Sequence, residues 1–282
     1  MSAKLSLVSD PLLRGACGAW AGACLEATLR ALRSPRAVRV SCSSAPAAGA
    51  GGGVFSGAAG RAEFVVMRRD LFAEHFEAGG EDAALGGAGA FFYLAQCLVR
   101  RWRRPCEAGA GGGRAATVAV AAGEEEGGLE KVEEEDEEDE DEEEEEELAD
   151  LQSAVPAWPL GDGAPPPDVQ AVTANLWMSP RATTSALHTD DEDNLLCVLR
   201  GRKVVALVAP GAARHLRPAP EGTHCEADVF TAGGAPTAAG ARFVEARAGD
   251  VVLIAKGVWH AVRSDAGTVA INFWSQKDWY SE

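Results

Sequence analysis

The sequence has no pair of cysteines at zinc-knuckle spacing and no long hydrophobic run. Its seven cysteines are an odd number and none lies three residues from another, which argues against a disulfide framework and a structural zinc site. No apolar run approaches the ~18–20 residues of a membrane-spanning helix, so we expect no membrane association. We therefore expect the cysteines to be reduced thiols, which predicts a cytoplasmic location. The nucleus is also compatible with reduced thiols.

Basic surface is also scarce. The chain has 26 basic and 43 acidic residues, and 19 of the acidic residues and one lysine fall within residues 124–147. The remainder carries 25 basic and 24 acidic residues, so it is nearly neutral and offers no basic face for a nucleic acid. The acidic tract is predicted either to bind a basic protein partner or to be a solvated segment without a role.

Several catalytic motifs are missing as well. The glycine-rich segments 49–53 and 109–113 do not lead into a phosphate-binding GK[ST] sequence, and no GxSxG or HExxH occurs. Cys197 lies in an apolar run and is predicted to be a core residue. The first 40 residues are mildly rich in arginine, which is compatible with an organelle transit peptide.

Short apolar runs separated by Gly, Pro and Asp dominate from about residue 169, which is typical of an antiparallel sandwich or small barrel. GRK (201–203) and AGD (248–250) are predicted to be hairpin turns between such strands. We predict three parts. Residues 1–106 form an N-terminal α/β elaboration, residues 107–150 a disordered Gly-rich and acidic insertion, and residues 151–282 the β-rich core.

Three residues form a candidate metal site. His188 and Asp190 lie two residues apart at the head of an apolar run, and His260 follows a predicted strand and tight turn. Two imidazoles and one carboxylate can occupy one face of an octahedral metal and leave three positions open, which suits non-haem Fe(II). A lone histidine is more often structural or exposed, so this prediction depends on the three side chains converging.

Polar residues near this motif suggest a cosubstrate pocket. Lys203 would pair with a carboxylate of a dicarboxylic cosubstrate if it lies on a strand neighbouring His188, and otherwise it is an exposed turn lysine. Ser185 would add a hydroxyl, with Thr184 as the alternative donor. Asn194 and Asn272 interrupt apolar runs, and buried amides need partners. For Asn194, a bond to its own backbone is equally compatible.

Three segments together resemble the JmjC (cupin-like) family of Fe(II)- and 2-oxoglutarate-dependent oxygenases. They are NLWMSPRATTSALHTDDEDNLLCVLRGRK (175–203), GDVVLIAKGVWHAVRS (249–264) and AINFW (270–274). PLLRGACGAW (11–20) is similar to the family's opening, which favours folded structure there over a transit peptide. The resemblance implies a mainly β fold, a double-stranded β-helix of jelly-roll type with an N-terminal α/β elaboration.

The resemblance also implies roles for individual residues. The iron ligands would be His188, Asp190 and His260, and the residues around 2-oxoglutarate would be Tyr93, Ser185, Asn194, Lys203 and Asn272. Trp177 and Trp274 would be core or cavity aromatics, with the core as the simpler expectation. Ser185 departs from the threonine usual in the small JmjC protein hydroxylases but keeps the hydroxyl.

The function implied is hydroxylation of a lysine or arginine side chain in a protein or peptide substrate, with Fe(II) as cofactor and 2-oxoglutarate as cosubstrate. Demethylation of N-methyl-lysine by the same chemistry is the first alternative. The second is a non-catalytic cupin-like scaffold whose acidic arm binds basic proteins. A scaffold does not need the complete set of His188, Asp190, His260 and Lys203, so the residues favour an enzyme.

Overall fold

A computed structural model describes residues 11–44, 53–55, 63–80, 90–103, 151–155, 158–161, 171–208, 216, 223–225, 228–230 and 241–275. The predicted insertion at 107–150 lies outside these residues. Within them, the helices are too short or too polar to cross a membrane.

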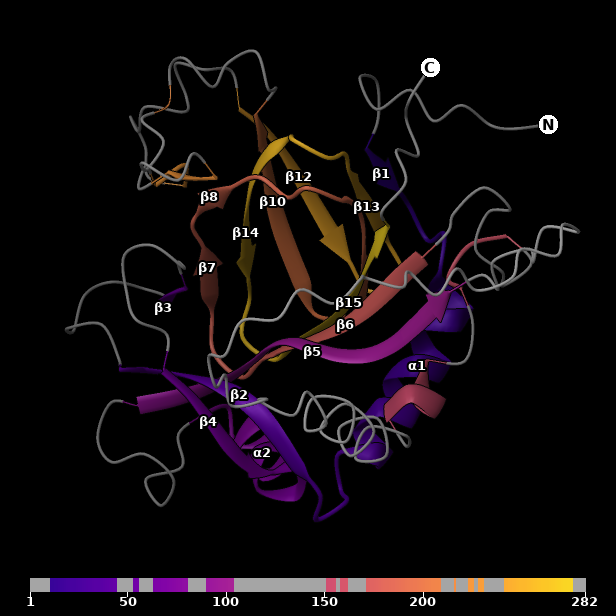
Figure 1. The fold of residues 1–282 in the computed structure, drawn as a ribbon, viewed down its shortest axis with the longest axis vertical. Helices are drawn as coiled ribbons and strands as arrows, with labels where there is room; N and C mark the ends of the chain where they lie inside the picture. The colour runs from indigo at the N-terminus through magenta and orange to yellow at the C-terminus, as the bar shows by residue number, and fades with distance from the viewer. Residues whose placement is uncertain are drawn as a thin grey trace, which may run out of the picture.

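Two mainly antiparallel sheets make up most of the described structure (Figure 1). The first has the strand order β1-β13-β9-β15-β6-β5-β2-β4, and the second has the order β11-β8-β14-β10-β12, with β7 and β3 attached through β14. The helices are α1 (Gly18–Ala31) and α2 (Arg69–Glu77), and the strands are β1 (Leu12–Leu13), β2 (Ala37–Ser44), β3 (Gly53–Phe55), β4 (Glu63–Arg68), β5 (Ala90–Arg103), β6 (Ala171–Ser179), β7 (Thr183–Ser185), β8 (Leu187–His188), β9 (Asp193–Arg200), β10 (Arg202–Val208), β11 (His224–Cys225), β12 (Arg242–Arg247), β13 (Val251–Ile254), β14 (Trp259–Ser264) and β15 (Thr268–Ser275). The predicted fold class, mainly β with a jelly-roll barrel and an N-terminal α/β elaboration, is confirmed.

The two predicted hairpins are wrong. GRK joins β9 to β10 and AGD joins β12 to β13, but each pair of strands is divided between the two sheets. β9 instead pairs with β13 and β15, while β10 pairs with β12 and β14. Both turns are therefore corners at which the chain crosses from one sheet to the other and closes the barrel.

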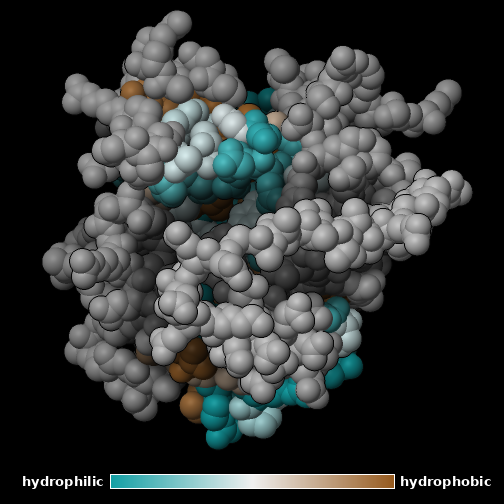
Figure 2. Space-filling model, viewed as in Figure 1, coloured by the Kyte–Doolittle hydropathy of each residue, from teal (hydrophilic) through white to brown (hydrophobic). Residues whose placement is uncertain are grey.

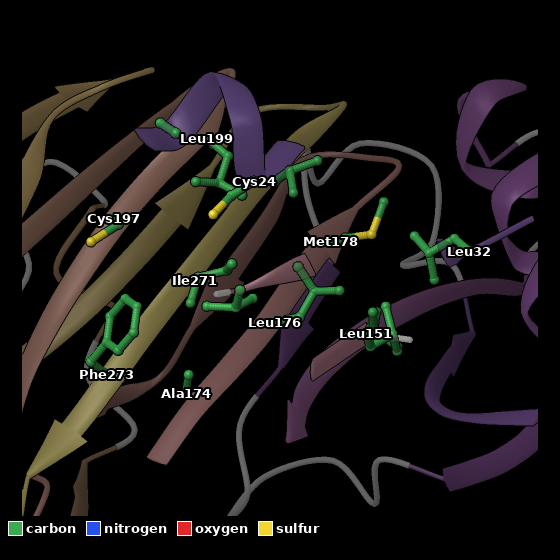
Figure 3. Packing of buried hydrophobic residues seen from close by; sticks show 14 of the residues in the cluster. Cys24, Leu32, Leu151, Ala174, Leu176, Met178, Cys197, Leu199, Ile271 and Phe273 are labelled. Carbon is green, nitrogen blue, oxygen red and sulfur yellow. The ribbon is translucent and has the colours of Figure 1, made fainter. Parts of the chain in front are cut away.

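The alternation of side chains along each strand builds two apolar layers on the first sheet. On one face, residues such as Leu176, Cys197 and Ile271 pack against α1 in the largest core cluster (Figure 3). Cys197 is fully buried there, as predicted. On the opposite face, residues such as Leu196 and Val252 meet Val205 of the second sheet. The strands with a nearly continuous apolar sequence are therefore the ones covered on both faces.

The opening segment is anchored to the barrel. β1 pairs with β13, and the Asp250 carboxylate accepts hydrogen bonds from the backbone N–H of Gly15 (2.8 Å) and the Arg14 guanidinium (2.9 Å). These donors, with the backbone N–H of Arg247, hold the pKa of Asp250 below its usual value despite its burial. The first of the described residues, from residue 11, therefore already belong to the folded structure.

The outer surface of the described residues is mostly polar. Figure 2 shows hydrophilic residues gathered over the upper strands, where Figure 1 places β8, β10 and β12. Among the described residues, the exposed large hydrophobic side chains are Val66 on β4 and Phe243 on β12. The outer face of the second sheet is covered by a third apolar cluster that includes Leu216 and Val229. Most apolar area is thus buried in three layers.

Gly201 is required at the corner between β9 and β10. Its φ is +81°, and a Cβ there would lie 2.7 Å from Thr268 Oγ1 and 3.0 Å from Thr268 Cα. We expect Gly201→Ala to lower the free energy of unfolding by about 2–4 kcal/mol, measured by urea denaturation. Gly161→Ala is the matched control, because its φ is +65° but no atom lies within 4 Å. Equal losses in both variants would show that the Thr268 contact is unimportant.

Candidate metal centre

His188, Asp190 and His260 converge at one end of the barrel interior. His188 ends β8 and His260 lies opposite it on β14, with ring centroids 4.2 Å apart. Asp190 follows in the turn after β8, with Oδ1 3.8 Å from His188 Nε2 and Oδ2 3.5 Å from His260 Nε2. One donor atom from each residue lies within 4.8 Å of the others. The structure thus brings the three predicted residues together.

Backbone carbonyls fix the tautomers of both histidines. His188 Nδ1 lies 2.8 Å from the carbonyl oxygen of Ala186, and His260 Nδ1 lies 2.9 Å from that of Val258. Because a carbonyl can only accept a hydrogen bond, each Nδ1 must carry the proton. In the neutral rings, each Nε2 therefore presents a lone pair. Burial, with His188 nearby, lowers the pKa of His260, so this ring is neutral at neutral pH.

This arrangement calls for a cation. Two Nε2 lone pairs and the Asp190 carboxylate face one another, and the buried Oδ2 accepts no hydrogen bond from the described residues. Such a set of acceptors is repulsive until a positive charge lies between them. An ion ~2.1 Å from three donors in cis positions separates them by ~3 Å, so small side-chain shifts would close the site. The donors fit a divalent cation of the Fe(II) type.

One side of this donor set is open. The side chain of His260 is 3% exposed, whereas those of His188 and Asp190 are 24% and 20% exposed. The loop that carries Asp190 is fixed by hydrogen bonds from Thr189 N to Thr223 O (2.9 Å) and from Gly257 N to Asp190 O (3.0 Å). A substrate can therefore approach the donor set from solvent without the loop unfolding.

Lys203 lies inside the barrel, although no hairpin places it there. It is the second residue of β10 and lies directly opposite Ser264 on β14. His260 lies four residues along β14 from Ser264, which puts all three on the interior face. The residue is 4% exposed, and its ammonium donates to Ser264 Oγ at 2.7 Å. Burial lowers its pKa from 10.5 to about 8. An acidic partner in the pocket would therefore be strongly favoured.

Hydroxyl groups surround this lysine end of the pocket. Ser185 faces inward, and its Oγ accepts the backbone N–H of Val262 at 2.8 Å. Thr184 pairs with Arg263, which places it on the opposite face from Ser185, so it is not the alternative donor. Thr183 shares the inner face and lies 3.0 Å from Ser179 Oγ.

Tyr93 reaches the same region from β5. It is 6% exposed and forms a hydrogen bond with Thr183, while burial raises the pKa of its phenol, which therefore stays protonated. Its ring centroid lies 6.3 Å from that of Trp177. The predicted pocket residue from the N-terminal part thus meets the hydroxyls contributed by the barrel.

The two predicted asparagines form one network. The indole N–H of Trp177 donates to Asn272 Oδ1 (2.7 Å), and Asn272 Nδ2 donates to Asn194 Oδ1 (3.3 Å). This excludes the alternative in which Asn194 bonds only its own backbone. The core expectation for Trp177 and Trp274 is wrong, because both lie on the interior faces of β6 and β15 outside the apolar clusters.

Several polar residues of the pocket were not predicted from sequence. Asn175 faces the same interior, and its Nδ2, like the indole N–H of Trp274, finds no acceptor among the described residues. Ser264 and Thr183 carry hydroxyls at strand ends, which resemble ordinary turn residues in sequence. His224 lies on a strand of only two residues, too short to leave a periodic pattern. Only the pairing of distant strands identifies these residues.

A jelly-roll barrel in which two histidines and an aspartate converge, with a buried lysine on the same interior face, is typical of a metal-binding cupin. The family model described as "Cupin-like domain" matches residues 119–279, more than half of the chain. The chain therefore belongs to the cupin-like family, in its JmjC group.

The chain is similar to parts of two curated JmjC proteins. It is 36% identical over 119 residues to lysine-specific demethylase JMJ31 of Arabidopsis thaliana, covering 38% of this chain and 21% of that protein. It is 30% identical over 111 residues to Jumonji C domain-containing protein 5 of Drosophila melanogaster, covering 37% of this chain and 28% of the relative. The matched region thus spans less than a third of either relative.

Among solved structures, the chain is similar to an oxalate decarboxylase of Lactobacillus farciminis in its formate complex. The sequence identity is 16%, the TM-score is 0.24, and the match covers 37% of this chain and 23% of that one. A similarity at this level adds nothing to the assignment from the family and the site.

Proposed function

We propose that the chain is an Fe(II)- and 2-oxoglutarate-dependent oxygenase that hydroxylates a lysine or arginine side chain of a protein. The observation that carries the proposal is the set of facing acceptors: two Nε2 lone pairs and one carboxylate, with both histidine protons bound to backbone carbonyls. The buried Lys203 supports a second, anionic ligand in the same cavity.

In this proposal each end of the pocket has one task. His188, Asp190 and His260 hold the metal on one face and leave the other face open. Lys203 pairs with the far carboxylate of 2-oxoglutarate, and Ser185 directs its hydroxyl proton toward the same group, since its oxygen already accepts the Val262 N–H. The protonated phenol of Tyr93 can donate there as well.

The remaining residues orient the ligands and exclude water. The hydrogen bond from Trp177 to Asn272 Oδ1 fixes the orientation of the Asn272 amide. Its N–H group therefore points to Asn194 Oδ1 and donates to it. Leu196 and Val205, among other residues of the interior cluster, form an apolar wall beneath them. Because this apolar lining excludes water and lowers the local dielectric constant, it strengthens the attraction between Lys203 and the carboxylate.

Fe(II), when bound, supplies the activation of O₂ that couples decarboxylation of 2-oxoglutarate to oxidation of the substrate. The overall reaction balances as one substrate C–H bond, one O₂ and one 2-oxoglutarate giving one C–OH group, succinate and CO₂. The protein contributes positioning. The donor set is exposed at His188 and Asp190, so a substrate side chain that enters from solvent is held next to the metal.

Demethylation of N-methyl-lysine is a second candidate. It is favoured by the similarity to the Arabidopsis protein, whose name describes it as a lysine-specific demethylase. The same chemistry applied to an N-methyl group gives an unstable hydroxymethylamine that releases formaldehyde. Hydroxylation of a side-chain carbon that bears no nitrogen gives a stable alcohol. The two functions therefore differ in their products rather than in the ligands of the pocket.

The test is a peptide screen with intact-mass and succinate readouts. Peptides that present lysine, arginine or N-methyl-lysine are incubated with the protein, Fe(II), 2-oxoglutarate and O₂. A hydroxylase adds the mass of one oxygen with equimolar succinate, and a demethylase removes one methylene mass and releases formaldehyde. Asp190→Ala sets the background. Succinate no higher than this background with every peptide would contradict both activities and favour a non-catalytic scaffold.

A further inference from the structure

A third histidine covers the ring of His188 on the side away from His260. β8 lies between β14 and β11, so His188 has His260 as its partner on one side and His224 directly opposite on the other. The rings of His188 and His224 are stacked, with centroids 5.8 Å apart and an angle of 16° between planes. The His260 ring on the other side is tilted by 50°. The ring of His188 is therefore held between two imidazoles.

His224 is fixed in place by its own contacts. Thr223, the residue before it, accepts the backbone N–H of Thr189 at 2.9 Å, which joins this segment to the loop of Asp190. Its hydroxyl lies 3.0 Å from His224 Nδ1 and so orients the ring. His224 is half-buried, which limits the positions its ring can adopt.

His224 contacts His188 through its ring and does not supply a donor atom to the metal site. Within the described residues, the donor atoms that lie within 4.8 Å of one another come from His188, Asp190 and His260. His188 is also the less enclosed of the two histidines, with a side chain 24% exposed against 3% for His260. Apart from the Nδ1 bond to Ala186 and the approach of Asp190 Oδ1 to Nε2 at 3.8 Å, the described contacts of its ring are those with the neighbouring rings.

We propose that His224 is a positioning residue for the metal centre: its stacked ring holds His188 in the orientation that directs Nε2 toward Asp190 and His260. This inference rests on the proposed metal site. Without the neighbouring ring, His188 could turn about its side-chain torsions, and part of the metal-binding energy would be spent on ordering it. A flat ring of similar size should replace His224, because stacking does not require its nitrogens.

The experiment measures the affinity of the metal-free, full-length protein for Mn(II), followed by loss of the EPR signal of the free ion. His224→Ala should weaken Mn(II) binding about threefold to tenfold, the range expected for one aromatic contact. His224→Phe should restore the affinity to within about twofold of the natural protein. Cys225→Ala is the matched control, because Cys225 follows His224 on the same strand but is buried in the outer apolar cluster. It should lower Tm without changing Mn(II) affinity.

Each alternative outcome has a distinct meaning. Natural affinity in His224→Ala would overturn the positioning role and leave the metal site intact. Equal weakening in the alanine and phenylalanine variants would also overturn it, because a nitrogen of His224 would then be required. Failure of the natural protein to bind Mn(II), with a normal thermal transition, would overturn both this inference and the proposed metal site.

Discussion

Replacing His188 by alanine is expected to weaken metal binding by at least about a hundredfold and to abolish succinate release. Loss of an outer residue that is hydrogen-bonded to a metal ligand costs about 10–100-fold in metal affinity, and loss of a ligand itself should cost at least as much. The change leaves Asp190 and His260 as two donors on one face, which is too few to compete with water. Mn(II) titration and succinate release in the presence of a substrate peptide measure the two losses.

The folding of this variant should change little. His188 is partly exposed and contributes one hydrogen bond, from Nδ1 to the Ala186 carbonyl, which is worth about 1 kcal/mol. Thr184→Ala is a suitable control, because Thr184 lies on the neighbouring strand β7 but on the face opposite Ser185. Metal affinity and turnover in His188→Ala equal to those of the control would remove His188 from the site.

Much of the site could be predicted because its residues belong to local patterns. Two residues of the donor set are two positions apart in the sequence, and His260 comes directly after a tight turn whose Gly257 has a φ of +73°. Strands with alternating or continuous apolar residues were also recognisable, since burial on one or both faces leaves a direct mark on sequence.

The partition of strands between the sheets could not be predicted. Hairpin turns commonly use a glycine with positive φ, and so do the corners at Gly201 and Gly249, so turn chemistry does not distinguish the two. The difference lies in whether β10 pairs with β9 or with β12 and β14, and the paired residues of β12 and β14 are 35 to 61 positions away in the sequence. Lys203 was therefore expected to reach the interior from a strand paired with β9 in a hairpin. In the structure it does so from β10, which pairs with β12 and β14.

The polar connections of the pocket were hidden for the same reason. Trp177 and Asn272 are 95 residues apart, and an indole in an apolar run gives no sign that its N–H donates to a distant amide. The carbonyls of Ala186 and Val258 that fix the two histidine tautomers belong to backbone whose direction depends on the completed sheet. The sequence indicated which side chains form the candidate site, and the fold supplies their orientation.

Lys203→Met is expected to weaken 2-oxoglutarate binding by about a hundredfold to several thousandfold while the fold remains intact. The substitution keeps the length and apolar stem of the side chain but removes the charge, and loss of one partner from a buried ion pair costs about 3–5 kcal/mol. Calorimetric titration with 2-oxoglutarate, in the presence of Mn(II) to prevent turnover, measures the loss. Ser264→Ala is the control, because it removes the hydroxyl that Lys203 contacts and leaves the ammonium in place.

The pH dependence provides an independent check on Lys203. Burial lowers the lysine pKa from 10.5 to about 8, and a carboxylate beside the ammonium would raise it again. Above pH 8, binding of 2-oxoglutarate must therefore take up a proton, so affinity should fall by up to about tenfold per pH unit, whereas it should be flat near pH 7. Lys203→Met should bind weakly without this dependence. A natural protein whose affinity is constant from pH 7 to 9.5 would show that Lys203 does not meet the carboxylate.

The free energy of unfolding of the ligand-free protein should rise with pH above pH 8, where the affinity for 2-oxoglutarate falls. The desolvation cost of the Lys203 charge is fully present below pH 8 and disappears as pH rises toward the unfolded pKa of 10.5, because the unfolded chain then binds more protons than the folded one. Lys203→Met lacks this cost, so at pH 7 its Tm should equal or exceed that of the natural protein, and the difference should shrink between pH 8 and 10. A buried lysine that destabilises the empty pocket but strengthens its anionic complex is retained for binding and not for folding. A Tm for Lys203→Met well below that of the natural protein at pH 7 would show instead that the lysine supports the fold.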